Sequence, residues 1–235
     1  MRARIPRHST RVYFVRHGEV EARYHRIFGG SRIDMELSPL GHIHGRAVAE
    51  WFEKSALDAI YVSPMVRARQ TAAPLLKAFG MEGRVREALR EVDFGDWTGF
   101  GWAEVQERFG VEAYDWLEVL ENGGIPNGEC ADRLRARVGP ELERILEENA
   151  ERSVAVVCHG GIVRVALALL LGQPLSHMAH FNVDYGSITA VELHPHKKHA
   201  VEIELLNFCP LTDRVGPWGR ASERSLAGLT GENRV

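Results

Sequence analysis

The sequence predicts an α/β protein, a three-layer sandwich in which a mostly parallel central sheet carries helices on both faces and a small helical cap covers the site. Three observations favour this fold class. Short apolar runs rich in β-branched residues alternate with segments of helical periodicity. Two of these runs end in a histidine followed by glycine, at the kind of strand end where ligands bind. The 235 residues suffice for one sizeable core but are short for two independent domains.

The first part of the chain predicts a strand, a helix, a second strand and a second helix, at residues 11–15, 39–54, 59–62 and 63–79. Both helix starts carry a capping serine followed by proline at the first helical position. Ser38 precedes Pro39, and Ser63 precedes Pro64. We therefore expect each helix to begin directly at its serine.

The segment 94–128 predicts short helices that form a cap, because it concentrates aromatic residues between glycines: Trp97, Phe100, Trp102, Phe109, Tyr114 and Trp116. Packing within the cap is the favoured role for these rings. The alternative, a base-stacking platform, would need a basic stripe that the sequence lacks. Beyond the cap, the pattern predicts a helix, a strand, a helix and two strands at 131–149, 153–158, 162–171, 187–193 and 200–207.

Domain organisation follows from where this periodicity stops. Residues 1–209 are expected to form a single domain that includes the cap. Residues 210–235 are polar and Gly-rich with little periodicity, which predicts a flexible C-terminal tail.

Composition and charge limit the partners. The 29 Lys and Arg residues against 32 Asp and Glu residues give a net charge of −3, so no overall field favours nucleic acid or an anionic membrane. The longest apolar stretch, 162–171, contains Arg164 and is too short to span a bilayer. The three cysteines show no paired spacing, which suits a reducing compartment: Cys130, Cys158 and Cys209. We expect a cytoplasmic protein without membrane or nucleic-acid partners, and a homodimer is left open.

Two strand ends carry the candidate chemistry. The runs Val15-Arg16-His17-Gly18 and Cys158-His159-Gly160-Gly161 each place a histidine just after a predicted strand. In an open α/β sheet the carboxyl ends of the strands meet where ligands bind, so His17 and His159 can share one pocket. A lone histidine at such a place is more often a packed residue than a catalyst. Whether these two histidines are catalytic is therefore judged from the charged residues around them.

These charged residues suit phosphoryl transfer. The transferred group spreads negative charge over its equatorial oxygens, and guanidinium, imidazolium and N–H donors can meet that charge. Arg16 adjoins the first histidine, and Arg67 follows the second strand end, where its planar fork can bind phosphate oxygens. Gly160 opens a helix whose N–H groups can approach an anion closely.

Glu91 is the candidate general acid for the leaving oxygen, with Asp93 as its competitor. Arg69 competes in the same way with Arg67, although it would face elsewhere on the helix. A histidine-rich run at 194–199 raises the question of a metal. Its proline and the lack of a carboxylate or cysteine favour a solvated turn instead.

Five motifs occur in a specific order: Arg16-His17-Gly18-Glu19, Ser63 to Thr71 with Arg67-Ala68, Glu91 before Phe94-Gly95-Asp96-Trp97, Gly128-Glu129, and Cys158-His159-Gly160-Gly161. Each is weak alone, but together over residues 12–208 they are specific. In this order they resemble the histidine phosphatase superfamily, and within it the phosphoglycerate mutase-like branch of phosphatase type.

The resemblance implies a reaction through a phosphohistidine. His17 would attack phosphorus in line. Arg16, Arg67 and His159 would bind the phosphoryl oxygens. Glu91 would protonate the leaving group before water attacks the phosphoenzyme. Neither a metal ion nor an organic cofactor is implied.

Two positions near the nucleophile depart from the family pattern. Val20 stands where relatives carry a hydroxyl residue, and Arg23 where an asparagine commonly contacts phosphate. Arg23 can supply a donor of its own. With Arg26 and Arg32 nearby, it suggests a second anionic group on the substrate.

The two histidines are predicted to titrate apart. For attack, the reacting nitrogen of His17 must be unprotonated while the other donates to a backbone carbonyl, which fixes the tautomer. His159, surrounded by phosphate, is expected to favour the charged imidazolium.

Three functions remain open. The favoured one is a phosphomonoester hydrolase acting on a small phosphorylated metabolite. A phosphoglycerate mutase of the cofactor-dependent type shares the chemistry, but would carry a longer insertion after the acid glutamate than residues 94–126 provide. A non-catalytic phosphate-binding or scaffold module would be expected to lack the nucleophile, an arginine or the acid, and this sequence has all of them.

Overall fold

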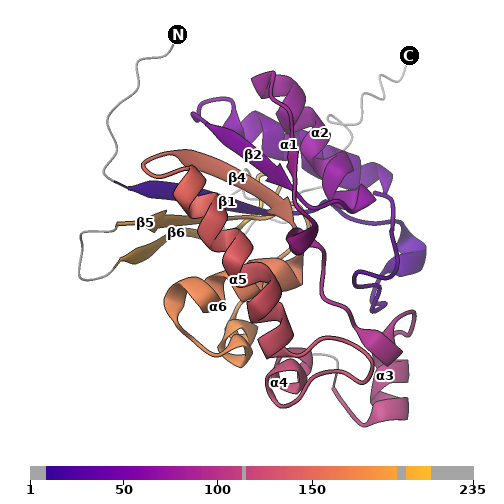
Figure 1. Cartoon of the computed structure of the whole chain (residues 1–235). Coiled ribbons are helices and arrows are strands. Elements are labelled where there is room, and N and C mark those ends of the chain that lie inside the picture. Colours follow the sequence, from indigo (N-terminus) through magenta and orange to yellow (C-terminus); the bar gives the residue numbers. More distant parts are fainter. Residues whose placement is uncertain (1–8, 113–114, 195–199, 213–235) are drawn as a thin grey trace, which may run out of the picture.

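The computed structural model describes residues 9–112, 115–194 and 200–212, and its centre is one six-stranded sheet in the order β3-β2-β4-β1-β5-β6 (Figure 1). Four strands run in parallel: β1 (Thr10–Arg16), β2 (Ala59–Val62), β3 (Arg84–Val85) and β4 (Ser153–Cys158). The last two strands pair antiparallel beside β1, namely β5 (Ile188–Leu193) and β6 (Val201–Phe208). The predicted mostly parallel sheet is confirmed, and the two-residue edge strand β3 is an addition to it.

Helices cover both faces of this sheet (Figure 1). One face packs against α1 (Pro39–Phe52) and α2 (Val66–Phe79). The other packs against α5 (Ala131–Glu148) and α6 (Gly160–Leu171). Successive strand residues point to opposite faces, so each strand contributes to both cores. In β1, for example, Val15 lies in the α1–α2 core and Phe14 in the α5–α6 core.

Short helices connect and cap these layers: η1 (Ala22–Tyr24), η2 (Glu87–Leu89), η3 (Gly95–Trp97), α3 (Trp102–Phe109), α4 (Trp116–Glu121) and η5 (Leu175–His180). The predicted cap contains η3, α3 and α4. Its aromatic rings pack on one another and on the loop before α1, with ring centroids 5.4 Å apart for both Phe28–Trp97 and Phe94–Trp116. Trp97 and Leu117 share the α5–α6 core. The cap is therefore continuous with the main core on that side.

The serine predicted to cap each of the first two helices does so in α1 but not in α2. Ser38 caps α1 as predicted, since its hydroxyl accepts from the Gly41 N–H at 3.0 Å. However, α2 begins at Val66 rather than at Ser63, because the Ser63 hydroxyl is hydrogen-bonded to His159 and does not cap the helix.

The predicted tail also starts too early. Leu211 is buried against Ile43 and Ala47 of α1, so packing continues beyond residue 209. The remainder of the predicted tail, 213–235, and most of the predicted histidine-rich turn, 195–199, lie outside the described residues. Across the described ranges, no helix combines the length and apolar character that a membrane span needs.

Candidate active site

One cavity of about 490 Å³ at the carboxyl end of the sheet is lined by most of the predicted site residues, namely Arg16, His17, Arg67, Glu91 and Gly160. Parallel pairing of β1 with β4 sets Arg16 opposite Cys158, and the next residue along, His17, donates its backbone N–H to the Cys158 carbonyl at 3.0 Å. This register brings the rings of His17 and His159 close together, with their centroids 5.2 Å apart. The two strand ends therefore meet as the topology rule predicts.

The tautomer of His17 is set by its neighbours. Its Nδ1 lies 2.8 Å from the carbonyl oxygen of Gly18. Because a carbonyl can only accept, Nδ1 must carry the hydrogen, as the sequence analysis expects. The other nitrogen, Nε2, accepts from Nε of Arg67 at 3.3 Å. Nε2 is thus the nitrogen that carries the lone pair, which in this structure accepts the hydrogen bond from Arg67.

His159 is completely buried and is held by Ser63, the serine that the sequence pattern predicts as a helix cap. The Ser63 hydroxyl lies 2.7 Å from Nε2 of His159. Nδ1 of His159 is buried and has no hydrogen-bond partner among the described residues. If the hydroxyl donates to Nε2, Nδ1 carries a hydrogen without a partner, although His159 itself is not among the residues that line the cavity. Pairing of β2 with β4, which brings these strand ends together, could have revealed Ser63.

The charge of His159 differs from the expectation. Burial first, and the Arg67 guanidinium second, hold the pKa of both His17 and His159 well below the usual histidine value. In the protein alone the pKa values of both histidines are therefore shifted in the same direction, which favours the neutral form of each. The expectation of a charged His159 rested on phosphate, whose negative charge would oppose the guanidinium groups.

The guanidinium groups have mainly backbone partners. Arg67 is 3% exposed and donates to the carbonyls of Ile33 at 3.2 Å and Gly30 at 3.0 Å. Burial lowers the pKa of Arg67 to about 10, against the opposing effect of Glu91. Arg69 is exposed, so it is Arg67 that the structure brings to the cavity.

Arg16 lies over the Tyr185 ring, 4.1 Å from its centroid, and donates to the Val183 carbonyl. Its Nε is buried and has no hydrogen-bond partner within the described part of the chain. Tyr185 and Val183, which also line the cavity, carry no sequence signal that would have identified them.

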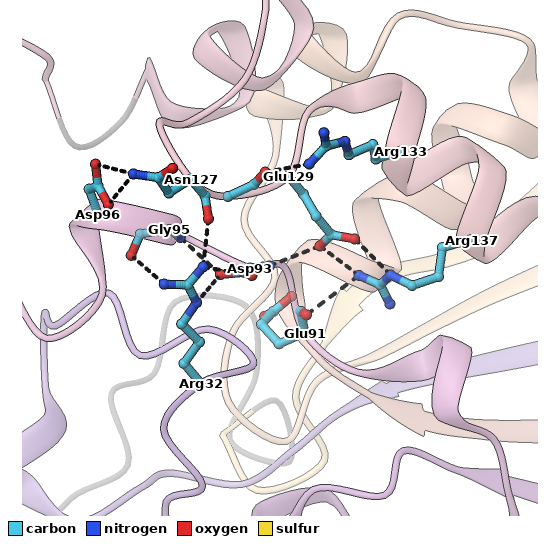
Figure 2. Close-up of polar contacts among 10 residues, drawn as sticks. Arg32, Glu91, Asp93, Gly95, Asp96, Asn127, Glu129, Arg133 and Arg137 are labelled. Carbon is cyan, nitrogen blue, oxygen red and sulfur yellow. Dashed lines mark hydrogen bonds and ion pairs between the residues drawn. The ribbon is translucent and has the colours of Figure 1, made fainter.

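Glu91 enters the cavity as an acceptor of two backbone N–H groups. One oxygen accepts from Val92 at 2.9 Å, and the other accepts from Gly161 of α6 at 3.2 Å. Asp93, its competitor, does not line the cavity. The Asp93 carboxylate is paired with Arg32 at 2.7 Å and accepts from the Gly95 N–H at 2.9 Å (Figure 2).

The backbone that carries Glu91 is held from α5 by Arg137 (Figure 2). Arg137 donates to the carbonyls of Ala88 at 2.7 Å and Arg90 at 2.9 Å, and its Nη2 lies 3.5 Å from the Glu91 carbonyl. It also makes two 2.8 Å hydrogen bonds to the Glu129 carboxylate.

Glu129 closes this arrangement on the other side of Glu91. Its carboxylate accepts from the Asp93 N–H, and its own N–H donates to the Asp93 carbonyl, both at 2.9 Å. Arg137 and Glu129 therefore fix the chain immediately before and after the candidate acid.

The arginines of the first loop are not brought into the cavity. Arg23 is a surface residue, 69% exposed at its side chain, and is paired with Glu21 at 2.7 Å. Arg32 is paired with Asp93 as described, and Arg26 is not among the residues that line the cavity. Val20, which replaces the usual hydroxyl, is buried and does line it. In this structure the loop thus supplies an apolar wall and no cationic side chain from Arg23, Arg26 or Arg32.

The rest of the wall is largely aromatic and apolar, and comes mainly from the loop before α1 and from the cap: Tyr24, Ile27, Phe28, Phe94, Trp102, Trp116 and Leu117. Among the described residues, no group of three or more His, Cys, Asp or Glu side chains is placed to hold a metal ion. The cavity thus combines a cationic floor with an apolar upper wall.

Comparison with known proteins gives consistent relatives. A model of the histidine phosphatase superfamily (branch 1) matches residues 12–205. The chain is 31% identical to a Hydrogenobacter thermophilus protein provisionally named phosphoserine phosphatase 2, over 83% of this chain and 96% of that one. It is 25% identical to the adenosylcobalamin/alpha-ribazole phosphatase of Escherichia coli, over 78% and 90% of the two chains.

Among solved structures, a mycobacterial glucosyl-3-phosphoglycerate phosphatase superposes with a TM-score of 0.76 at 26% identity, covering 85% of this chain and 99% of that one. These three relatives are named as phosphatases, which favours hydrolysis over the mutase alternative.

Proposed function

This chain belongs to branch 1 of the histidine phosphatase superfamily, and from that membership we propose that it hydrolyses a small phosphorylated metabolite through a phosphohistidine formed on His17. The observation that carries the proposal is the state of this side chain. His17 is neutral, with its hydrogen on Nδ1 and its lone pair on Nε2, within the cavity lined by Arg16 and Arg67.

In the first step, Nε2 of His17 attacks phosphorus and the ester P–O bond breaks. Protonated Glu91 gives its proton to the leaving oxygen, so an alcohol departs. The negative charge of the transferred group is met by Arg16 and Arg67, by the Gly160 N–H at the start of α6, and by Nδ1–H of His159. Ser63 assists by fixing the His159 tautomer that donates from Nδ1.

In the second step, water attacks phosphorus, the N–P bond breaks, and its electron pair returns to Nε2 of His17. Glu91 accepts a proton from the water and is ready for the next cycle. The products are the alcohol and inorganic phosphate. Cationic side chains and N–H donors supply all the charge stabilisation that these steps need, so we propose that the reaction proceeds without a metal ion or an organic cofactor.

The alternatives are weaker. A mutase would return the phosphoryl group from His17 to the product, which requires that water be kept out. A scaffold that merely binds phosphate would not need Glu91 to be held at two N–H groups and braced from α5. We further propose a cytoplasmic location, because the cysteines are free thiols: Cys130, Cys158 and Cys209. The homodimer stays a prediction.

Rapid-quench trapping tests the proposed intermediate. Enzyme mixed with a ³²P-labelled phosphomonoester is quenched in alkaline detergent after milliseconds, and acid-labile, base-stable label is expected on the wild-type chain but not on His17→Ala. Phosphate release from an aryl phosphate and conversion of 3-phosphoglycerate are assayed in parallel. Mutase activity with negligible phosphate release would overturn hydrolysis, and absence of trapped label and of turnover across a panel of phosphoesters would favour the scaffold.

A further inference from the structure

Arg164 is a cationic residue of the cavity that the reaction proposed above does not use. It is the fifth residue of α6, one turn after Gly160, and it lines the cavity together with Arg16. From the surroundings of Arg164 we infer a second anion subsite, which selects phosphomonoesters that carry a carboxylate or a second phosphate close to the scissile phosphate. This inference rests on the proposed phosphatase function and names its substrate class.

The charge of Arg164 is not balanced by a neighbouring carboxylate. Its three hydrogen-bond acceptors are all backbone carbonyls, those of Met178 at 3.2 Å, Gly160 at 3.3 Å and Phe181 at 3.1 Å. A guanidinium has five N–H groups, so two of them remain for a ligand. Within the described part of the chain, Arg164 makes no ion pair.

The nearest acidic groups are committed elsewhere. Glu91 and Asp184 are the carboxylates whose charge reaches Arg164. Glu91 accepts from two backbone N–H groups, and Asp184 accepts from the Asn207 side chain at 2.8 Å. Burial and the like charge of Arg16 lower the pKa of Arg164 to about 10, and the opposing effect of Glu91 and Asp184 is the smaller one. A buried cation of this kind is costly unless an anion joins it.

The position of Gly160 shows where such an anion would lie. A Cβ atom built on this glycine would be 3.5 Å from Nε of Arg16 and 3.5 Å from Nη1 of Arg164. The guanidinium groups of Arg16 and Arg164 therefore border the same glycine. Nε of Arg16, the buried donor without a partner described above, belongs to the proposed phosphoryl-binding site. An anionic group held by Arg164 would thus lie close to the scissile phosphate.

This subsite replaces the one that the sequence suggested. Arg23, Arg26 and Arg32 were expected to hold a second anionic group, but they lie on the surface or pair with acidic residues. Arg164, in contrast, lies inside the cavity and beside the phosphoryl-binding residues. The second charge is therefore bound next to Gly160 and away from the first loop.

Matched substrate pairs test this inference. Phosphoserine and phosphoethanolamine differ by one carboxylate, as do 3-phosphoglycerate and glycerol 3-phosphate, and fructose 1,6-bisphosphate against fructose 6-phosphate tests a second phosphate. Wild-type enzyme is expected to prefer the more charged member at least tenfold in kcat/KM, mainly through KM. Arg164→Gln, which keeps amide donors for the carbonyls, is expected to remove most of that preference, and Arg164→Lys to keep part of it.

The control is Arg86→Gln, since Arg86 is also partly buried but pairs with Glu141 at 2.7 Å outside the cavity. This substitution should leave the substrate ratios unchanged. An equal loss for both members of each pair would overturn the subsite and place Arg164 on the transferred phosphoryl group. If Arg164→Gln fails to fold, the wild-type ratios decide, because a ratio near one for every pair contradicts the inference. Failure of the proposed function is distinct: it would abolish hydrolysis of all six compounds and of p-nitrophenyl phosphate.

Discussion

Burial favours the neutral form of two histidines of the cavity region, at a slightly acidic pH where a histidine in water would carry a proton. His17 and His159 are each within 5% exposure, and Arg16 and Arg67 add positive charge beside them. For a nucleophile this is useful, because its lone pair stays available below neutral pH. For the stability of the fold it has a cost at acidic pH.

The direction in which stability changes with pH follows from these pKa shifts. The pKa of each histidine is lower in the folded state than the value of about 6.5 expected for the unfolded chain. Below pH 6.5 the unfolded chain binds more protons, so the free energy of unfolding should fall as the pH falls from about 7 through 6.5 to 5.5. Urea titrations at these values measure it. His159→Gln should reduce the pH dependence, whereas His177→Gln, at an exposed position, should not. A free energy of unfolding that is flat or rises on acidification would contradict the assignment.

At the scale of elements, the start of α6 is shaped around the candidate acid. A Cβ on Gly161 would lie 2.4 Å from Oε1 of Glu91 and 2.7 Å from Cγ2 of the buried Val92, so both side chains would have to move. Gly161→Ala is therefore expected to lower kcat roughly tenfold to a hundredfold by displacing Glu91. The higher helix propensity of alanine, about 0.5–1 kcal/mol, should offset part of the stability lost by displacing buried Val92.

Gly139 in α5 provides the matched control, because the nearest atom to a Cβ there is 4.0 Å away. Gly139→Ala should leave kcat unchanged. Steady-state kinetics and thermal unfolding of both variants separate the two effects. A Gly161→Ala enzyme with wild-type kcat would show that the position of Glu91 is not critical.

Arg137 of α5 should influence kcat by positioning Glu91. Arg137→Ala removes the donors that hold the backbone on one side of the acid, and its effect on kcat should depend on the leaving group. We expect a loss of roughly tenfold to a hundredfold for an alkyl phosphate and a much smaller one for an aryl phosphate, whose leaving oxygen needs little protonation. In a Glu91→Gln background the loss should disappear. Arg135→Ala, on the same helix but paired with Glu121, is the control. Equal losses for both leaving groups, persisting without Glu91, would indicate a general structural defect instead.

At the scale of the whole molecule, the cap and the main sheet share one core. Trp97 and Leu117 lie in the same buried cluster as Phe14 of β1, so the cap should not unfold on its own. In a Trp51→Phe, Trp218→Phe double variant, the remaining tryptophans all belong to the cap: Trp97, Trp102 and Trp116. Their fluorescence and the far-UV circular dichroism should show the same urea midpoint. A lower midpoint by fluorescence would reveal a separately unfolding cap, contrary to the predicted single domain.

The sequence predicts features that depend on local patterns better than features that depend on pairing between distant segments. Five of the strands and the main helices follow from periodicity, and His17 and His159 from the rule that strand ends meet. Ser63 was assigned as a helix cap because its link to His159 depends on pairing between β2 and β4. The roles of Arg137 and Arg164 depend on which carbonyls lie within reach, which no local pattern contains.

The strand order also bears on how the protein is made. Among the strands of this sheet, β1 is the first to leave the ribosome, yet its two neighbours, β4 and β5, are synthesised much later. A nascent chain that ends before β4 already contains His17, Arg67 and Glu91 but has no partner beside β1 to bring them together. It also exposes the apolar residues of β1 and β2, a surface on which chaperones act. Completion of synthesis, and not the appearance of any single catalytic side chain, is therefore the event that turns on the enzyme.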